Sequence, residues 1–480
     1  MLVALIVACA LFMENLDGTV ISTALPQIAA SIGTDPIRLS LGITAYLLSL
    51  AVFIPVSGWV ADRFGARTIF RAAIAVFTVG SILCGLSNSL FELTAARVLQ
   101  GLGGAMMVPV GRLVLLRSVD KRELVRAMAY LTVPALLGPV MGPPVGGFLA
   151  TYVSWRWIFF LNVPIGIAGI ALVSIFIENH REPDVPPLDL VGFILSGLAL
   201  SGLMLGFETI GRDGVPPAVA AALLATGLIS AVGYVRHASR HPHPLLDLTL
   251  FGIPTFRIAV GGGLMFRIGM GALPFLLPLM LQLGFGMTAF ASGMLTFASA
   301  AGALIMKMTA QPILRWLGFR LTLFWNALIS SAFLFIYAAL RPGTPDLLIL
   351  ALLLAGGFFR SLQFTGLNTL AFADIVPVRM SRATSLSSTA QQLSMSIGVA
   401  TGAALLHATL AVRGTGDLAA DDFWPAFVAL GVLTVGSAAL FARLAPDAGA
   451  ELTGRHSASA AAVPTPDPRR SEGRVAGTGD

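Results

Sequence analysis

Long apolar stretches separated by short polar segments dominate the chain. Fourteen of them reach about 20 residues, the length that an α-helix needs to cross the hydrocarbon core of a bilayer. Beyond them, residues 446–480 are rich in Ala, Pro, Ser, Gly and Arg, and we predict a disordered cytoplasmic tail there. The predicted transmembrane helices lie near 2–26, 41–61, 69–88, 92–116, 128–151, 156–177, 190–210, 216–235, 257–283, 288–313, 320–340, 346–372, 384–410 and 423–444.

The composition indicates a multi-pass membrane protein without a large soluble domain. Hydrophobic residues make up 56% of the chain and charged residues 11%, against about 25% charged residues in soluble domains. Cys9 and Cys84 both fall in apolar stretches, so we expect neither a disulfide nor a metal site. The net charge of +6 lies in short loops between apolar segments, which argues for topology signals rather than a nucleic-acid partner.

The basic residues predict the orientation in the membrane. With the N-terminus placed inside, 20 of the 30 Lys and Arg residues fall in inner loops and the tail, and five fall in outer loops. This excess predicts that both termini are cytoplasmic. We expect the membrane to be a bacterial inner membrane. No cleavable signal peptide is visible, and Met1 opens directly into the first helix, so we expect the natural start slightly upstream.

A faint internal repeat suggests how the chain is divided. The loop at 58–67, after the second predicted helix, has a weaker copy at 314–320, after the tenth. Two six-helix halves would place the copies after helices 2 and 8, so two extra helices are inserted between the halves. The predicted domains are a six-helix bundle at 1–177, a linker with two extra helices at 178–240, a second six-helix bundle at 241–445 and the tail at 446–480.

The loop after the second predicted helix is a candidate conformational latch. Gly65 supplies backbone freedom where the chain must turn tightly. Asp62 can pair with Arg63 or Arg67, or lie at a helix N-terminus. Acids and arginines in a cytoplasmic loop can also be topology signals alone, but the placement of Gly58 and Gly65 around the acid favours a specific contact between helices.

Glu14 and Asp17 place two acids at membrane depth in the first predicted helix. An ionisable group there costs about 2.5–3.5 kcal/mol on insertion scales, so such groups usually have a function. Residues at positions i and i+3 share a helix face, and we therefore expect both acids to face the same cavity or partner. The pair is a candidate proton-handling site.

Four stretches together resemble the major facilitator superfamily, and within it the fourteen-helix drug:proton antiporter branch. The loop at 58–67 resembles the superfamily signature. Residues 16–26 resemble the first-helix motif of the branch, although members usually carry Asn where this chain has Ser22. Residues 97–105 match the fourth-helix motif, and 138–147 match the fifth-helix antiporter motif with Gly138, Pro139, Gly142, Pro143, Gly146 and Gly147.

The resemblance covers about residues 1–445 and implies a transporter rather than an enzyme. It implies two six-helix bundles plus two inserted helices, and export of hydrophobic or amphipathic drugs in exchange for protons, without a cofactor. The expected partners are the small-molecule substrate, protons, the lipid bilayer and a candidate periplasmic adaptor, and we expect a monomer. The fifth-helix motif would seal one side of the cavity; the alternative is a kinked packing helix with no role in function.

The family fold also implies that Asp17 and Arg97 can meet. By helix rise, Asp17 lies roughly 13 Å and Arg97 about 8 Å below the same membrane surface. Two interpretations stay open, a permanent neutralising pair or a pair that breaks when Asp17 takes a proton. Glu14 is an extra proton site, a contact for cationic substrates or a plain polar lining residue.

Four other cations fall within predicted spans and are candidates for the substrate cavity: Arg112, Arg267, Lys307 and Arg360. Each would face the interior or extend to the membrane surface. The histidines at 236–243 lack a neighbouring Cys or acid, so we expect a basic inner loop and no metal site. Two alternative functions remain: transport of one metabolite, such as a siderophore, sugar or organic acid, and a membrane sensor that transports nothing.

Overall fold

The chain folds into helices in the part that the computed structural model describes, which is residues 2–118, 124–179, 185–209, 216–376, 379–414 and 418–453. For residues 116–117 and 124–136 the backbone alone is described. No strand occurs in these ranges, and long apolar helices dominate them. The prediction of an all-α membrane protein is therefore confirmed.

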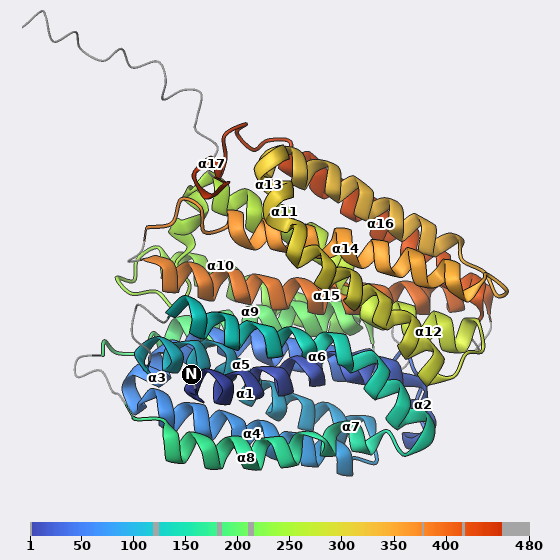
Figure 1. Ribbon diagram of the computed structural model, residues 1–480, viewed down its shortest axis with the longest axis horizontal. Coiled ribbons are helices and arrows are strands. Elements are labelled where there is room, and N and C mark those ends of the chain that lie inside the picture. The colour runs from blue at the N-terminus through green and yellow to red at the C-terminus, as the bar shows by residue number, and fades with distance from the viewer. Residues whose placement is uncertain are drawn as a thin grey trace, which may run out of the picture.

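Twelve helices in these ranges are long and apolar enough to cross a membrane. One of them, α13 (Ala289–Ala339), has 51 residues and would be about 76 Å long, more than twice the ~30 Å of a bilayer core. It breaks at Gly318, and Figure 1 shows its ribbon reversing direction near its label. Each predicted span falls on helical residues, whereas the number of fourteen crossings stays a prediction.

The first half of the chain forms one bundle, drawn from blue to teal in the lower part of Figure 1. Within it α1 packs against α6, α5 packs against α3 and α4, and α8 packs against α4. Its elements are α1 (Leu2–Val20), the 3₁₀-helix η1 (Ile21–Ala24), α2 (Leu25–Ile32), α3 (Ser40–Phe64), α4 (Ala66–Leu86), α5 (Leu90–Ser118), α6 (Leu124–Tyr152), α7 (Arg156–Phe160) and α8 (Asn162–Phe176).

The second half forms another bundle, drawn from yellow to red in the upper part of Figure 1. Here α13 packs against α14 and α16, and α11 packs against α15 and α16. The two halves meet where α13 packs against α6 and where α15 packs against α3. Besides α13, its elements are η2 (Leu248–Gly252), α11 (Pro254–Gly271), α12 (Leu273–Leu279), the π-helix η3 (Met280–Gly284), α14 (Asp346–Leu370), α15 (Met380–Arg413), η5 (Ala420–Asp422), α16 (Trp424–Phe441) and α17 (Ala450–Thr453).

A hairpin of two further helices, α9 (Leu190–Thr209) and α10 (Pro217–Ala238), connects the bundles. α9 contacts both α3 and α15, so the hairpin lies beside the line where the two halves meet. At one end of α9 the Glu208 carboxylate accepts a hydrogen bond from the Ser40 hydroxyl (2.9 Å). The hairpin lies within the segment 178–240 to which the displaced repeat assigns two extra helices.

The two loops of the repeat share one backbone conformation. Gly65, between α3 and α4, has φ 95° and ψ 132°, and Gly318, at the break in α13, has φ 77° and ψ 166°. A residue with a Cβ adopts such angles only under strain. Both chain reversals therefore require glycine, which explains why the repeat remains visible in the sequence.

The first helix of each half is interrupted at corresponding places. In the first half α1 passes into the 3₁₀ turn η1 just before Pro26, which has no N–H to bond the carbonyl of Ser22. In the second half α11 gives way to α12, which contains Pro278, and then to the π turn η3. Interrupted helices at matching positions of two repeats flank the binding site in many transporters.

The predicted tail is partly folded. The short helix α17 (Ala450–Thr453) lies within it and contacts α13. A Cβ at Gly449 would lie 2.7 Å from the Phe319 ring, so the chain runs closely past the start of the second arm of α13. Apolar packing therefore extends beyond 446, and residues 454–480 lie outside the described ranges.

Candidate functional site

Asp17 and Arg97 form a closely held ion pair inside the first bundle. Arg97 Nη1 lies 2.5 Å from Asp17 Oδ2, and each side chain is at most 1% exposed. Arg97 also donates from Nε to the Gly42 carbonyl (3.1 Å), and its guanidinium lies over the Tyr46 ring at 4.1 Å from the centroid. The predicted approach of the first and fourth spans is thus present in the structure.

Three polar side chains, from Ser81, Gln100 and Asn162, surround the ion pair and form hydrogen bonds with it or with one another. The Gln100 amide donates to Asp17 Oδ1 (2.8 Å) and accepts from Arg97 Nη1 (2.6 Å). The Asn162 amide donates to the same Asp17 oxygen (3.0 Å), and both amides donate to the Ser81 hydroxyl, at 2.7 and 3.2 Å. We call Asp17, Ser81, Arg97, Gln100 and Asn162 the Asp17 cluster. Both carboxylate oxygens are satisfied, so the buried charge is compensated.

Glycines bring the helices of this cluster together. A Cβ at Gly101 would lie 2.6 Å from Ser49 Cβ, and a Cβ at Gly80 would lie 2.7 Å from Gln100 Cα. Such contacts let α5 approach α3 and α4 backbone to backbone, which places Arg97 and Gln100 within reach of Asp17. The glycines of the fourth-span motif therefore serve close packing.

Glu14 faces a different environment, and the expectation that both acids face the same cavity or partner is wrong. Glu14 lines a cavity of about 520 Å³ between the two halves, which we call the Glu14 cavity. Its Oε2 has no hydrogen-bond partner in the described residues, and Arg112 lines the same cavity. Residues three apart diverge by about 60° around a helix, enough to turn Glu14 towards the second half and Asp17 into the first bundle.

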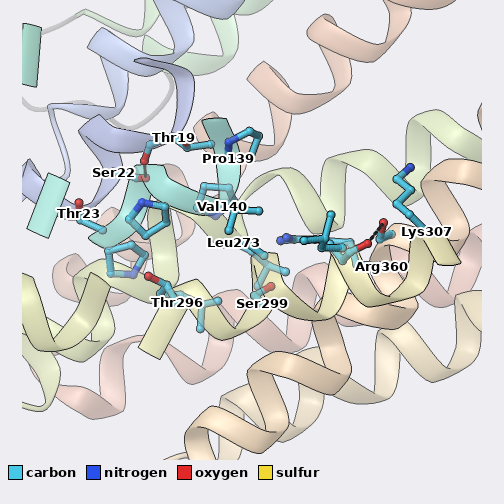
Figure 2. Close-up of a pocket in the computed structure, with 18 residues that line it drawn as sticks. Thr19, Ser22, Thr23, Pro139, Val140, Leu273, Thr296, Ser299, Lys307 and Arg360 are labelled. Atoms are coloured by element: carbon cyan, nitrogen blue, oxygen red, sulfur yellow. Dashed lines mark hydrogen bonds between the residues drawn. The ribbon is translucent and has the colours of Figure 1, made fainter. Parts of the chain in front are cut away.

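A second cavity of about 180 Å³ adjoins it, and we call it the Arg360 cavity. Figure 2 shows its lining from both halves, with Thr19, Ser22 and Thr23 of α1 and η1 on one side and Lys307 and Arg360 on the other. Pro139 of the antiporter motif lines both cavities. The cavities therefore meet at α6, next to the interrupted helices of the two halves.

The four predicted cavity cations separate into three positions. Arg112 lines the Glu14 cavity, and Lys307 and Arg360 line the Arg360 cavity. Arg267 lines neither of these two cavities. It is 1% exposed and donates from Nη2 to Asn368 Oδ1 (2.8 Å), and Asn368 itself lines the Glu14 cavity.

The antiporter motif packs α6 tightly against α1. Cβ atoms at Gly138, Gly142 and Gly146 would lie 2.9 Å or less from atoms of Leu16, Thr19 and Val20 respectively. These glycines are four residues apart and form one face, which lies along the turn of α1 that carries Asp17. Despite its four prolines, α6 stays a continuous helix rather than a broken one.

The same motif reaches the second half at the end of the molecule that holds α2 and α12, on the right in Figure 1. A Cβ at Gly147 would lie 2.4 Å from the Ala289 carbonyl oxygen, and a Cβ at Gly293 would lie 2.3 Å from that of Pro143. At this end Gln282 also bonds the Gln27 side chain (3.1 Å) and donates to the Thr23 carbonyl (2.9 Å). We call it the closed end.

Comparison with known proteins decides the family. The model of the Major Facilitator Superfamily matches residues 7–399, most of the chain. The chain belongs to the major facilitator superfamily. It is therefore a transporter and not an enzyme, as the sequence predicts.

Relatives and a solved structure agree with this assignment. Two relatives are each named "Putative multidrug resistance protein MdtD". The one from Pectobacterium carotovorum is 40% identical over 401 residues, 84% of this chain and 86% of that protein. The one from Cronobacter sakazakii is 37% identical over 449 residues, which cover 92% of this chain and 94% of that protein. The crystal structure of a D-xylose-proton symporter has the same fold, with a TM-score of 0.68 at 14% identity, over 93% of this chain and 98% of that one.

The candidate latch of the transporter is tied to the end of α8. Arg67 donates to the Ile177 carbonyl (3.2 Å), and the Thr68 N–H donates to Asn179 Oδ1 (3.4 Å). A Cβ at Gly65 would lie 2.3 Å from that same Asn179 oxygen. The loop thus binds the segment that leads out of the first bundle, a contact that the sequence did not reveal.

Gly65→Ala is expected to destabilise this loop by about 1–3 kcal/mol, because Ala at positive φ is strained and its Cβ would displace Asn179. The measurement is the melting temperature of the detergent-purified transporter, together with its transport rate. Gly58→Ala is the matched control, since a Cβ at Gly58 has no neighbour within 4 Å. Equal melting temperatures for the two variants would contradict the assignment.

The inserted hairpin has an anchor at the N-terminal end of α9. Asp189 accepts hydrogen bonds from the Gly192 N–H (2.8 Å) and the Leu245 N–H (3.1 Å), and its Oδ1 lies 2.6 Å from His237 Nε2. Asp189, His237 and His241 lie close enough together to be a candidate metal-ligand group. The sequence analysis expected no acid near this histidine loop. That expectation is wrong, because the fold brings Asp189 next to His237. Hydrogen bonds already occupy both carboxylate oxygens, so we assign Asp189 to anchoring.

Acid is expected to weaken this anchor. Burial alone would raise the pKa of Asp189, but the hydrogen bonds from Gly192, His237 and Leu245 hold the pKa below its usual value of about 3.9. A carboxyl group whose pKa is lower in the folded than in the unfolded state stabilises the fold at pH values above its unfolded-state pKa. This stabilisation is lost as the pH falls through the folded-state pKa. Melting temperatures measured from pH 7 to pH 3 should therefore fall more steeply for the wild type than for Asp189→Asn.

At pH 7, Asp189→Asn should already be about 1.5–3 kcal/mol less stable than the wild type, the value of hydrogen bonds to a charged group. Asp346→Asn, at the exposed start of α14, is the matched control and should follow the wild-type pH profile. A parallel loss of stability with pH in wild type and Asp189→Asn would argue against the anchor.

Proposed function

We propose that this transporter exports hydrophobic or amphipathic compounds across a bacterial inner membrane in exchange for protons. The observation that carries the proposal is the Asp17 cluster, a buried ion pair at membrane depth held by side chains from four helices. A carboxylate of this kind is rarely retained in a span unless it serves a substrate or proton pathway. The names of the relatives support drug-like substrates.

The proposed mechanism is a cycle of proton binding and release at Asp17. A proton on Asp17 removes the charge that compensates Arg97, and the cluster must then rearrange, because an unpaired buried arginine is costly. The packing of α6 along the same turn of α1 would pass this change to the closed end. One proton moving inwards supplies about 2.3 kcal/mol per 100 mV. Exchange requires that proton and substrate favour different states of the transporter.

The closed end would face the periplasm if the N-terminus is cytoplasmic, as the charge distribution predicts. The Glu14 cavity would then belong to a state that receives substrate from the cytoplasmic side. Reporter fusions after residue 240 and after residue 460 should both report a cytoplasmic location. Opposite locations for the two fusions would contradict the proposed topology.

Purified transporter in proteoliposomes tests the exchange. An imposed pH gradient should drive accumulation of a lipophilic compound against its concentration, and added substrate should in turn move protons, reported by a trapped pH dye. Collapse of the gradient with an ionophore is the control. Accumulation that continues at the same rate after collapse would exclude proton exchange.

A further inference from the structure

We propose that the Arg360 cavity binds amphipathic anions, molecules that carry an acidic group on an apolar body. This inference rests on the proposed export function and specifies its substrate class. The cavity lies between the halves and is lined by both of them, as a site in an alternating-access transporter must be. Its charge and its walls decide which chemistry it would accept.

The charge of the cavity is positive and uncompensated. Lys307 and Arg360 line it, and no Asp or Glu is among the described residues that do so. Lys307 Nζ donates to the Thr365 hydroxyl (2.8 Å), a neutral partner. Arg360 has neither a hydrogen bond nor an ion pair with a described residue. The nearby Glu14 cavity differs, because an acid and an arginine line it together.

The two cations lie at separate points of one wall. Thr365, which holds Lys307, follows Arg360 by five residues on α14, about 7.5 Å along the helix axis. Figure 2 shows Arg360 reaching towards Leu273 and Val140, with Lys307 farther out on the same side. A guanidinium offers a planar pair of donors that matches a carboxylate or sulfonate. Arg360 would therefore bind the acidic group, and Lys307 would attract it at the periphery.

The remaining walls suit an apolar body. Ten of the 18 lining residues are proline, leucine, alanine or valine, including Pro139, Pro143, Leu273 and Leu277. Six hydroxyl side chains, among them Thr296 and Ser299, supply weaker polar contacts. A cation in a membrane span is tolerated where it faces a cavity or an opposite charge, and a bound anion would provide that charge. A cationic drug would add a third positive charge to this site.

Competition binding with one apolar body and three head groups tests the proposal. Tritiated naphthylacetate should bind the detergent-purified full-length transporter, and the competitors are unlabelled naphthylacetate, naphthylethanol and naphthylethylammonium. The acid should compete at least tenfold better than the alcohol, the loss expected when a charge-assisted hydrogen bond is absent. Equal competition by the alcohol, or stronger competition by the ammonium compound, would overturn the proposal.

Variants of the two cations assign the binding to this cavity. Arg360→Gln should weaken naphthylacetate binding about tenfold or more, Arg360→Lys should restore only part of it, and Lys307→Gln should weaken it several-fold. Arg257→Gln, which removes an exposed charge at the start of α11, is the matched control. Monodisperse elution and unchanged melting show that each variant is folded. If folded Arg360→Gln bound naphthylacetate with wild-type affinity, the anion would bind elsewhere and the assignment would be overturned.

The source of the anion is a separate arm of the test. Mixed micelles with phosphatidylglycerol compete if the site accepts an anionic lipid, whereas phosphatidylcholine micelles are the neutral control. Competition by phosphatidylglycerol supports a ligand from the bilayer, and its absence together with naphthylacetate binding supports dissolved organic acids. The assay needs no proton gradient, so its failure leaves proton exchange standing, and failure of exchange leaves the binding result standing.

Discussion

Asp17→Asn is expected to abolish proton-driven accumulation while leaving substrate binding detectable. Asn has nearly the size of Asp but does not titrate, and it leaves Arg97 buried without a counter-charge. Loss of one partner from a buried ion pair costs about 3–5 kcal/mol, so the variant should also melt at a lower temperature. The measurement is uptake into proteoliposomes driven by a pH gradient, beside equilibrium binding of the same compound.

Asn162→Ala is the matched control, because it removes one hydrogen bond to Asp17 (3.0 Å) but keeps both charges. It should slow transport several-fold and preserve coupling to protons, in line with the ~0.5–3 kcal/mol value of a hydrogen bond. Glu14→Gln should act more weakly than Asp17→Asn, because Glu14 lines the Glu14 cavity and lies outside the Asp17 cluster. Full proton-driven uptake by Asp17→Asn would move the coupling site to Glu14 or to the second half.

Gly147→Ala is expected to prevent the closed end from closing as it does in this structure. The added Cβ would lie 2.4 Å from the Ala289 carbonyl oxygen and 2.9 Å from Phe290 Cα, which are backbone atoms that cannot rotate away. Overpacking of this kind costs about 1–3 kcal/mol, so the equilibrium should shift about tenfold or more towards the state in which the end is open. Transport should fall by a similar factor, because the cycle requires both states.

Distances between spin labels on α2 and α12 report the state of the closed end. They should lengthen in Gly147→Ala and also in Gly293→Ala, whose Cβ would lie 2.3 Å from the Pro143 carbonyl oxygen. Gly261→Ala in α11 is the control, since a Cβ there has no neighbour within 4 Å. Unchanged label distances together with wild-type transport in Gly147→Ala would show that this contact does not determine closure.

The sequence alone determines the class of the protein, most of its helices and the depth of its charged residues. Apolar length is a local property, so the spans and the position of Asp17 within the first of them can be predicted without tertiary contacts. The repeat of Gly65 at Gly318 is also local, since both positions need the same glycine conformation. The family follows from four short motifs for the same reason.

Tertiary structure decides which polar groups meet. Asn162 was not predicted, although a lone amide in an apolar span was a usable signal, because its contact with Asp17 joins residues 145 positions apart. The i, i+3 spacing predicts that Glu14 and Asp17 share a cavity or partner, but helix packing gives them different surroundings. Lys307 and Arg360 share a cavity only because α13 packs against α14. Such pairings depend on how whole helices approach, and the spacing along one helix does not contain that information.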